Sequence, residues 1–162
     1  MNSEVEVPSR LAQEIGKKEP FLLAEQEAFL NLQRTAQALE ADFKALFRRH
    51  GLSLTTYNLL RILRGHRPSG VRCNTIREQL VVRVPDVTRL VDRLIDCGLV
   101  ERQADPVDAR AVLVHITRKG LRLLERLDEP VMSLHRKQLA HMSPEQLDTL
   151  SQLLQTARTP LE

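Results

Sequence analysis

The sequence VTRLVDRLIDCGLVERQADPVDARAVLVHITRKG, from Val87 to Gly120, contains the change of pattern that decides the fold. In its first third, apolar residues recur at three- and four-residue steps, as on one face of an amphipathic helix, and Gly98 ends that helix. Residues 99–103 and 112–116 have the patterning of strands and are separated by a turn rich in Asp and Pro. The stretch therefore predicts a helix followed by a two-stranded antiparallel hairpin.

The residues just before this stretch predict a second short helix and a tight turn. Val71–Cys73 fits one short strand, and Asn74 can cap a helix over Thr75–Leu80. A turn over Val81–Val84 then leads to Pro85, expected at the first position of a helix Pro85–Cys97, where its missing N–H costs nothing. Two short helices joined by a tight turn and followed by a hairpin form a winged helix-turn-helix.

Longer helices are expected on both sides of this module. Phe21–His50 has helical periodicity with no internal Gly or Pro, and Ser53 can cap a further helix that ends at Gly65. After the hairpin, Thr117 can cap a long helix in which Pro130 should introduce a kink. Ser143, with Pro and Gln at the next positions of a helix start, caps the last helix. The predicted fold class is mainly α with a small β-wing, an α+β winged helix-turn-helix on a helical scaffold.

Composition and charge narrow the function. Among 162 residues, aromatic residues make up only 3%, which argues against a binder that stacks single-stranded bases on aromatic platforms. Residues 61–122 carry a net charge of +6, whereas the rest of the chain carries −3. A basic middle between acidic ends is typical of a module that faces phosphates, although charge runs are more often solvated faces. If the chain binds nucleic acid, double-stranded DNA is therefore the expected partner.

Other classes of protein are disfavoured. The two cysteines, Cys73 and Cys97, lie in no metal-binding or CxxC spacing, which indicates a reducing compartment. We expect both to be packing residues, with redox sensing by Cys73, next to Arg72, as the alternative. No metal or cofactor is expected, because the histidines are dispersed and no Gly-rich phosphate loop is present. The absence of a nucleophile elbow or an acid/base cluster argues against an enzyme. No apolar run is long enough for a membrane span or signal peptide, so a cytoplasmic protein is expected.

The outward face of the helix after Pro85 contains the candidate DNA-reading residues, which are Pro85, Asp86, Thr88, Arg89 and Arg93. A recognition helix needs an apolar face toward its scaffold and polar or cationic side chains toward the groove. Arg89 is the candidate for a bidentate pair with guanine, and Arg93 for a phosphate contact or an ion pair with Asp92 or Asp96. The alternative is that both arginines only solvate an amphipathic helix.

The tip of the hairpin contains two further candidates, Asp108 and Arg110. A cation on a β-wing suits the narrow minor groove, where the negative potential is enhanced. A carboxylate two residues away can hold the arginine or the loop in place. The alternative is an incidental surface ion pair of little energetic value.

The chain resembles the MarR family of transcription regulators in these segments. The family pattern T-R-L-V-D-R-L, G-L-V-x-R and D-P-x-D-x-R-x-x-x-V-x-L-T-x-x-G is matched from Thr88 to Gly120, with Ile116 in place of the usual Leu. Flanking similarity, such as Met142–Leu147, extends the resemblance from about Phe29 onward. Three departures stand out: Ala109, where the family often has Arg; Val81–Val84, which lacks the small or hydroxyl residues often seen there; and Asp86, which can accept from a cytosine amine or cap the helix.

The resemblance implies a homodimeric repressor on a pseudo-palindromic operator, released by a small aromatic or lipophilic effector. It implies a dimerisation helix over 21–50, the DNA-binding domain over 51–117 and C-terminal dimerisation helices over 118–162. Residues 1–20 show no clear period and contain Pro8, Gly16 and Pro20, which predicts a flexible N-terminal arm. His50 and Tyr57 are candidates for the effector pocket, although Tyr57 fits a core aromatic with one satisfied hydroxyl equally well. A helical ligand- or protein-interaction module without DNA binding is the alternative function.

Overall fold

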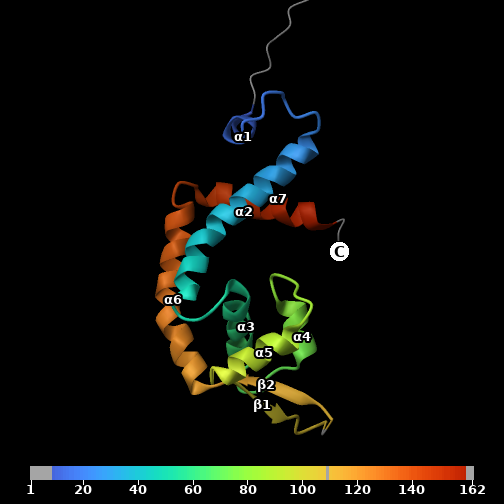
Figure 1. The fold of residues 1–162 in the computed structure, drawn as a ribbon, viewed down its shortest axis with the longest axis vertical. Coiled ribbons are helices and arrows are strands. Elements are labelled where there is room, and N and C mark those ends of the chain that lie inside the picture. The colour runs from blue at the N-terminus through green and yellow to red at the C-terminus, as the bar shows by residue number, and fades with distance from the viewer. Residues whose placement is uncertain (1–8, 109, 160–162) are drawn as a thin grey trace, which may run out of the picture. The chain divides into compact units, whose positions relative to one another are not determined.

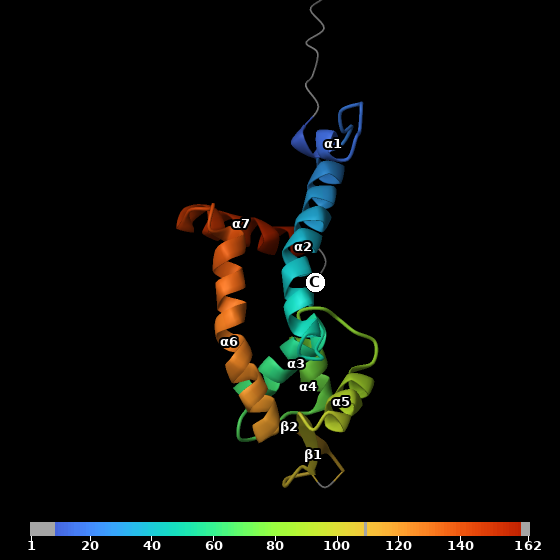
Figure 2. The same ribbon diagram turned by 60° about the vertical axis from the view of Figure 1, so that its left-hand side comes forward.

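The computed structural model describes residues 9–108 and 110–159. The chain divides into two compact units, Met1–Asp42 and Phe43–Glu162. The described elements, drawn in Figures 1 and 2, are α1 (Arg10–Glu14), α2 (Ala24–Arg48), α3 (Leu54–Gly65), α4 (Cys73–Gln79), α5 (Val87–Asp96), β1 (Val100–Ala104), β2 (Val112–Ile116), α6 (Arg118–Leu139) and α7 (Pro144–Arg158). The expected mainly helical fold with a small two-stranded wing is confirmed.

The first unit contains α1 and most of α2. Ser9 caps α1 by accepting a hydrogen bond from the N–H of Ala12, and Leu11 and Ala12 are buried. An ion pair of 3.0 Å between Arg34 Nε and Glu14 Oε2 joins the two helices. The sequence did not predict α1, because five residues give no helical period to detect. Residues 1–8 of the expected arm lie outside the described residues.

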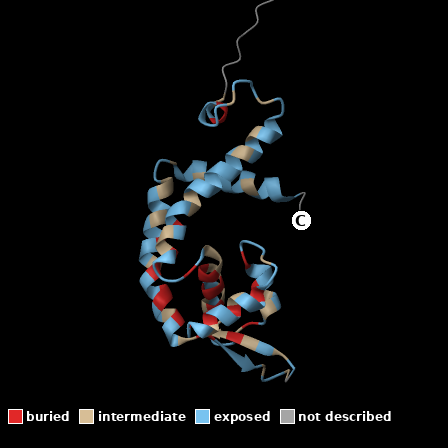
Figure 3. Cartoon of the chain, in the orientation of Figure 1, coloured by how far each residue is buried: buried red, intermediate tan, exposed pale blue. Residues whose placement is uncertain are grey.

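The second unit is built around one apolar core. In Figure 3 the buried residues gather on α3, α5, β2 and the first half of α6. Leu60 of α3, Ile76 of α4, Val91 of α5 and Leu124 of α6 are each 0% exposed. Because every element of the helix-turn-helix contributes to this core, the outward faces of α4 and α5 are held in fixed directions.

Three predicted helix starts are confirmed by their caps. Ser53 and Thr56 form a reciprocal capping box at α3, and Ser143 and Gln146 form another at α7. Thr117 caps α6 by accepting from the N–H of Gly120. Each cap supplies an acceptor for a backbone N–H that has no partner within its helix, and this explains why sequence alone located these boundaries.

Other boundaries differ from the expectation. α2 begins at Ala24 rather than Phe21, and α4 begins at Cys73, so Asn74 lies inside the helix and does not cap it. The expected strand over Val71–Cys73 is a single bridge, in which Val71 exchanges two backbone hydrogen bonds with Val114 of β2. Because those bonds fix Val71, the chain leaves the sheet at Arg72 and the helix starts at the next residue.

The wing is the antiparallel pair of β1 and β2, with Arg102 opposite Val114. α6 follows it and contains Pro130, and α7 has no buried residue. Among the described residues, no helix combines the length and the apolar composition needed to cross a bilayer.

Candidate nucleic-acid interface

Helix α5 has the two faces expected of a recognition helix. Val87, Val91 and Leu94 are buried, whereas Thr88, Arg89 and Arg93 are exposed. Asp86 is the N-cap, and its Oδ1 accepts the N–H of Arg89 at 2.9 Å. The expectation that Pro85 begins the helix is therefore wrong, because Asp86 satisfies the first-turn N–H and Pro85 lies one residue earlier, exposed in the turn.

A hydrogen bond to α3 holds the turn between α4 and α5, and two more arginines lie at this surface, one on α4 and one in the turn. Oδ1 of Asn58 accepts a hydrogen bond of 3.0 Å from the N–H of Val81. Beyond that residue, a hollow is lined by Arg77 and Glu78 of α4 and by Arg83, Val84 and Pro85 of the turn. Arg77 and Arg83 were missed as candidates, although Arg83 lies only four residues before α5 and Arg77 ten residues before it.

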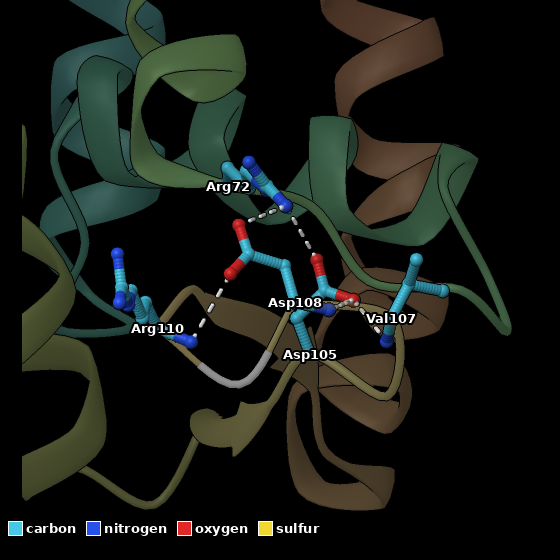
Figure 4. Close-up of polar contacts among 5 residues, drawn as sticks. All are labelled: Arg72, Asp105, Val107, Asp108 and Arg110. Carbon is cyan, nitrogen blue, oxygen red and sulfur yellow. Dashed lines mark hydrogen bonds and ion pairs between the residues drawn. The ribbon is translucent and has the colours of Figure 1, made fainter.

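Two carboxylates shape the tip of the wing (Figure 4). Asp105 Oδ1 accepts from the backbone N–H groups of Val107 at 2.9 Å and Asp108 at 3.3 Å. Asp108 Oδ1 in turn accepts from the backbone N–H of Arg110 at 3.1 Å. Asp108 thus holds the backbone of Arg110 and not its guanidinium, and the side chain of Arg110 is exposed. Ala109, between them, lies outside the described residues.

Arg72, at the start of α4, reaches across to the same two carboxylates (Figure 4). Its Nη2 lies 2.8 Å from Asp105 Oδ2 and 3.2 Å from Asp108 Oδ2. The hydrogen bond from Arg72 holds the pKa of Asp105 below its ordinary value. The contact between Arg72 and Asp105 could not be predicted from the sequence, because it spans 33 residues and no local pattern signals it.

Further contacts join α5 to the elements around it. Arg102 Nη1 of β1 pairs with Asp92 Oδ1 at 2.6 Å, so this aspartate is matched with the wing and not with Arg93. Nζ of Lys119 donates to the carbonyl of Cys97 at 2.7 Å, at the C-terminal end of α5.

The expectation that Cys97 is a core residue is wrong: it is exposed, because Gly98 turns the chain immediately after it. Cys73 is partly buried against the core.

The arginines of this surface fall into two groups. Arg72 and Arg102 are held by carboxylates. Within residues 9–108 and 110–159, by contrast, no ion pair engages the five exposed guanidiniums of Arg77, Arg83, Arg89, Arg93 and Arg110. Cations without carboxylate partners can bind phosphates or base edges without first breaking an internal bond.

The two residues proposed to line an effector pocket lie in different surroundings. His50 is exposed beyond the end of α2. Tyr57 is buried, stacks on Phe47 at 4.2 Å between ring centroids, and accepts a hydrogen bond from Arg61 Nη1 at 3.1 Å. Its surroundings match a core aromatic with a satisfied hydroxyl. In the described part of the chain, no group of three or more His, Cys, Asp or Glu side chains is placed to hold a metal ion.

Comparison with known proteins agrees with this geometry. A sequence model described as the MarR family matches residues 50–111. The HTH-type transcriptional repressor IacR of Pseudomonas putida is 25% identical over 134 residues, 83% of this chain and 79% of that protein. A MarR transcription factor from Planctomyces limnophilus is 40% identical, with a TM-score of 0.64, over 84% of this chain and 98% of that one.

A third similar protein has the same fold at lower identity. BpsR from Bordetella bronchiseptica, whose DNA binding is regulated by 6-hydroxynicotinic acid, is 22% identical with a TM-score of 0.74. The alignment covers 86% of this chain and 97% of that one.

Proposed function

The chain belongs to the MarR family of DNA-binding transcription regulators, and we propose that it is a homodimeric repressor released by a small-molecule effector. Members of this family are regulators rather than enzymes. The observation that carries the proposal is the set of exposed guanidiniums on the recognition helix and the wing that form no ion pair within the described part of the chain, beside arginines that carboxylates hold in place. Residues 51–117 are the proposed DNA-binding domain.

The exposed face of α5 supports reading in the major groove. Arg89 lies in the first turn, where its guanidinium can pair with O6 and N7 of guanine, and Thr88 beside it can contact a base or a phosphate. Arg93, one turn later, is placed for a phosphate contact. Asp86 already accepts the N–H of Arg89 through Oδ1, which leaves Oδ2 to accept from a cytosine amine. Arg110 would enter the minor groove from the wing.

Uncovered apolar surface on the flanking helices supports the dimer. Helix α7 has no buried residue, although it carries several leucines. Of these, Leu153 is 62% exposed and Leu150 is 37% exposed. Phe29 and Leu32 of α2 are 58% and 47% exposed. A two-turn or longer helix with uncovered leucines gains stability by packing against a partner. Residues 21–50 and 118–162 are therefore the proposed dimerisation segments, of which 160–162 lie outside the described residues.

The proposed effector is a small aromatic or lipophilic molecule. The similar regulator BpsR is controlled by 6-hydroxynicotinic acid, which is a compound of this size and aromatic character. His50 and Tyr57 remain candidates for the effector pocket, and the burial of Tyr57 means that a ligand could reach it only with local rearrangement. The alternative, an interaction module without DNA binding, has no need for the five unpaired arginines.

Selection from a random library of 30-base-pair duplexes tests this function. We expect the protein to enrich a motif of two inverted half-sites, with centres about one helical turn, roughly 34–36 Å, apart. Native mass spectrometry should find two chains per duplex. Enrichment of no motif would overturn the DNA-binding function, and a single half-site bound by one chain would overturn the dimer. Loss of the complex on titration with 6-hydroxynicotinic acid or a related aromatic acid would support the effector.

A further inference from the structure

We propose that Arg72 is the positioning residue of the wing: by bridging Asp105 and Asp108, it orders the tip so that Arg110 is presented to DNA. This inference rests on the proposed DNA-binding function. It assigns a role to a residue outside both the recognition helix and the hairpin.

The backbone places Arg72 against the wing. Val71 exchanges N–H and carbonyl hydrogen bonds of 3.1 and 2.9 Å with Val114 of β2 and is 5% exposed. On the other side of Arg72, the buried Ile76 ties α4 to the core. Gly70 allows the approach, since its φ is +68° and a Cβ there would overlap the imidazole of His115 on β2. The backbone of Arg72 is therefore held in place at the base of the wing.

The side chain of Arg72 completes a chain of bonds that reaches Arg110. One nitrogen, Nη2, contacts Oδ2 of both aspartates, while the Oδ1 atoms accept the backbone N–H groups of Val107, Asp108 and Arg110. Each carboxylate thus joins Arg72 to the loop backbone (Figure 4). The Asp105 side chain is 11% exposed and that of Arg72 is 51% exposed, so the bridge is sheltered from solvent mainly on the Asp105 side.

Charge gives Arg72 a second effect at the same place. Two carboxylates lie at the tip of an element that must approach phosphates, and like charges repel. The guanidinium of Arg72 offsets one of these two negative charges. Without it, the two carboxylates would repel each other and the tip would be less ordered, so Arg110 would no longer be held for the minor groove.

The test compares wild type, Arg72→Met and Arg72→Lys on a duplex that wild type has enriched from a random library. We expect Arg72→Met to raise Kd about tenfold. Arg72→Lys should recover most of the affinity, because one cationic nitrogen can still donate to both carboxylates. Arg10→Met is the matched control, since it breaks an exposed ion pair with Glu14 inside α1, and it should leave Kd unchanged.

Two readouts separate positioning from a general structural role or a direct DNA contact. In the Arg110→Ala background, Arg72→Met should add less than a twofold effect, because the residue it positions is gone. The slope of log K against log salt should be unchanged by Arg72→Met, whereas loss of a phosphate contact would reduce it by about 0.9. Independent effects of the two substitutions, or a slope reduced by that amount, would overturn the proposal.

A measurement without DNA completes the test. In the free protein, amide hydrogen exchange at Val107 and Arg110 should be faster in Arg72→Met than in wild type, with the amide of the buried Leu124 unchanged as a control for folding. Unchanged exchange at the tip would overturn the positioning role. If wild type enriches no duplex, the DNA-binding function fails at that earlier step, and the inference fails with it.

Discussion

The guanidinium of Arg64 in α3 makes two hydrogen bonds to the carboxylate of Asp128 in α6, at 2.8 and 2.9 Å. This bidentate ion pair links the first helix of the DNA-binding domain to the long helix that follows the wing. Arg61, one turn before Arg64, also contributes to the electrostatic environment of Asp128. The pair thus connects the domain that would read DNA to the segment that would hold the partner chain.

A double-mutant cycle of Arg64→Met and Asp128→Asn should give a coupling free energy of about 0.5–1 kcal/mol in urea unfolding. The side chains of Arg64 and Asp128 are 29% and 43% exposed, so solvent screens the pair and a larger value is not expected. A matched cycle on the more exposed pair Glu129 and Arg136 should give less than about 0.5 kcal/mol. Equal coupling in the two cycles would contradict a special role for the bidentate geometry.

The same ion pair should make stability depend on pH in acid. The hydrogen bond from Arg64 lowers the pKa of Asp128 in the folded chain below its value of about 3.9 in the unfolded chain. The contribution of the pair is therefore fully present above that unfolded value and is lost as the pH falls through the lower folded pKa. The difference in unfolding free energy between wild type and Asp128→Asn should be constant from pH 7 to 5 and then decrease toward pH 2.5. A constant difference throughout would refute this account.

Sequence patterns located most of the fold because the relevant signals are local. The caps at Ser53, Thr117 and Ser143 and the glycine after α5 act over three or four residues, so they can be read directly. The exposure of Arg89 follows equally from helical period. The Arg72 bridge could not be predicted, because it depends on the pairing of Val71 with Val114, 43 positions apart. Cys97 was misplaced because the helix ends one residue before it.

Gly70→Ala should destabilise the chain more than Gly51→Ala does. Both glycines have φ near +70°, which costs an alanine about 1 kcal/mol, and a Cβ at Gly51 would meet nothing within 4 Å. At Gly70 the Cβ would overlap the ring of His115, so the total cost should be about 2–3 kcal/mol. Urea unfolding measures both. Adding His115→Ala should recover part of the loss at Gly70, and equal costs at the two glycines would argue against the close approach.

Leu153→Asp should convert the proposed dimer into a monomer. The leucine is 62% exposed on α7, and a carboxylate buried at an interface without a partner carries a large desolvation penalty. Ser151→Asp, on the same helix and also exposed, is the matched control and should leave the dimer intact. Sedimentation equilibrium distinguishes the two states. A dimeric Leu153→Asp protein would place the interface elsewhere.

The central claim is that this chain binds operator DNA through the unpaired arginines of α5 and the wing. A salt-titrated binding assay of wild type and Arg110→Ala, on the duplex upstream of its own gene and on a shuffled duplex of equal composition, tests it most directly. The account predicts that wild type prefers the native duplex, that its affinity falls steeply with salt, and that Arg110→Ala loses about 1–3 kcal/mol. Equal affinity of wild type for both duplexes, with no loss in Arg110→Ala, would contradict the claim and favour an interaction module.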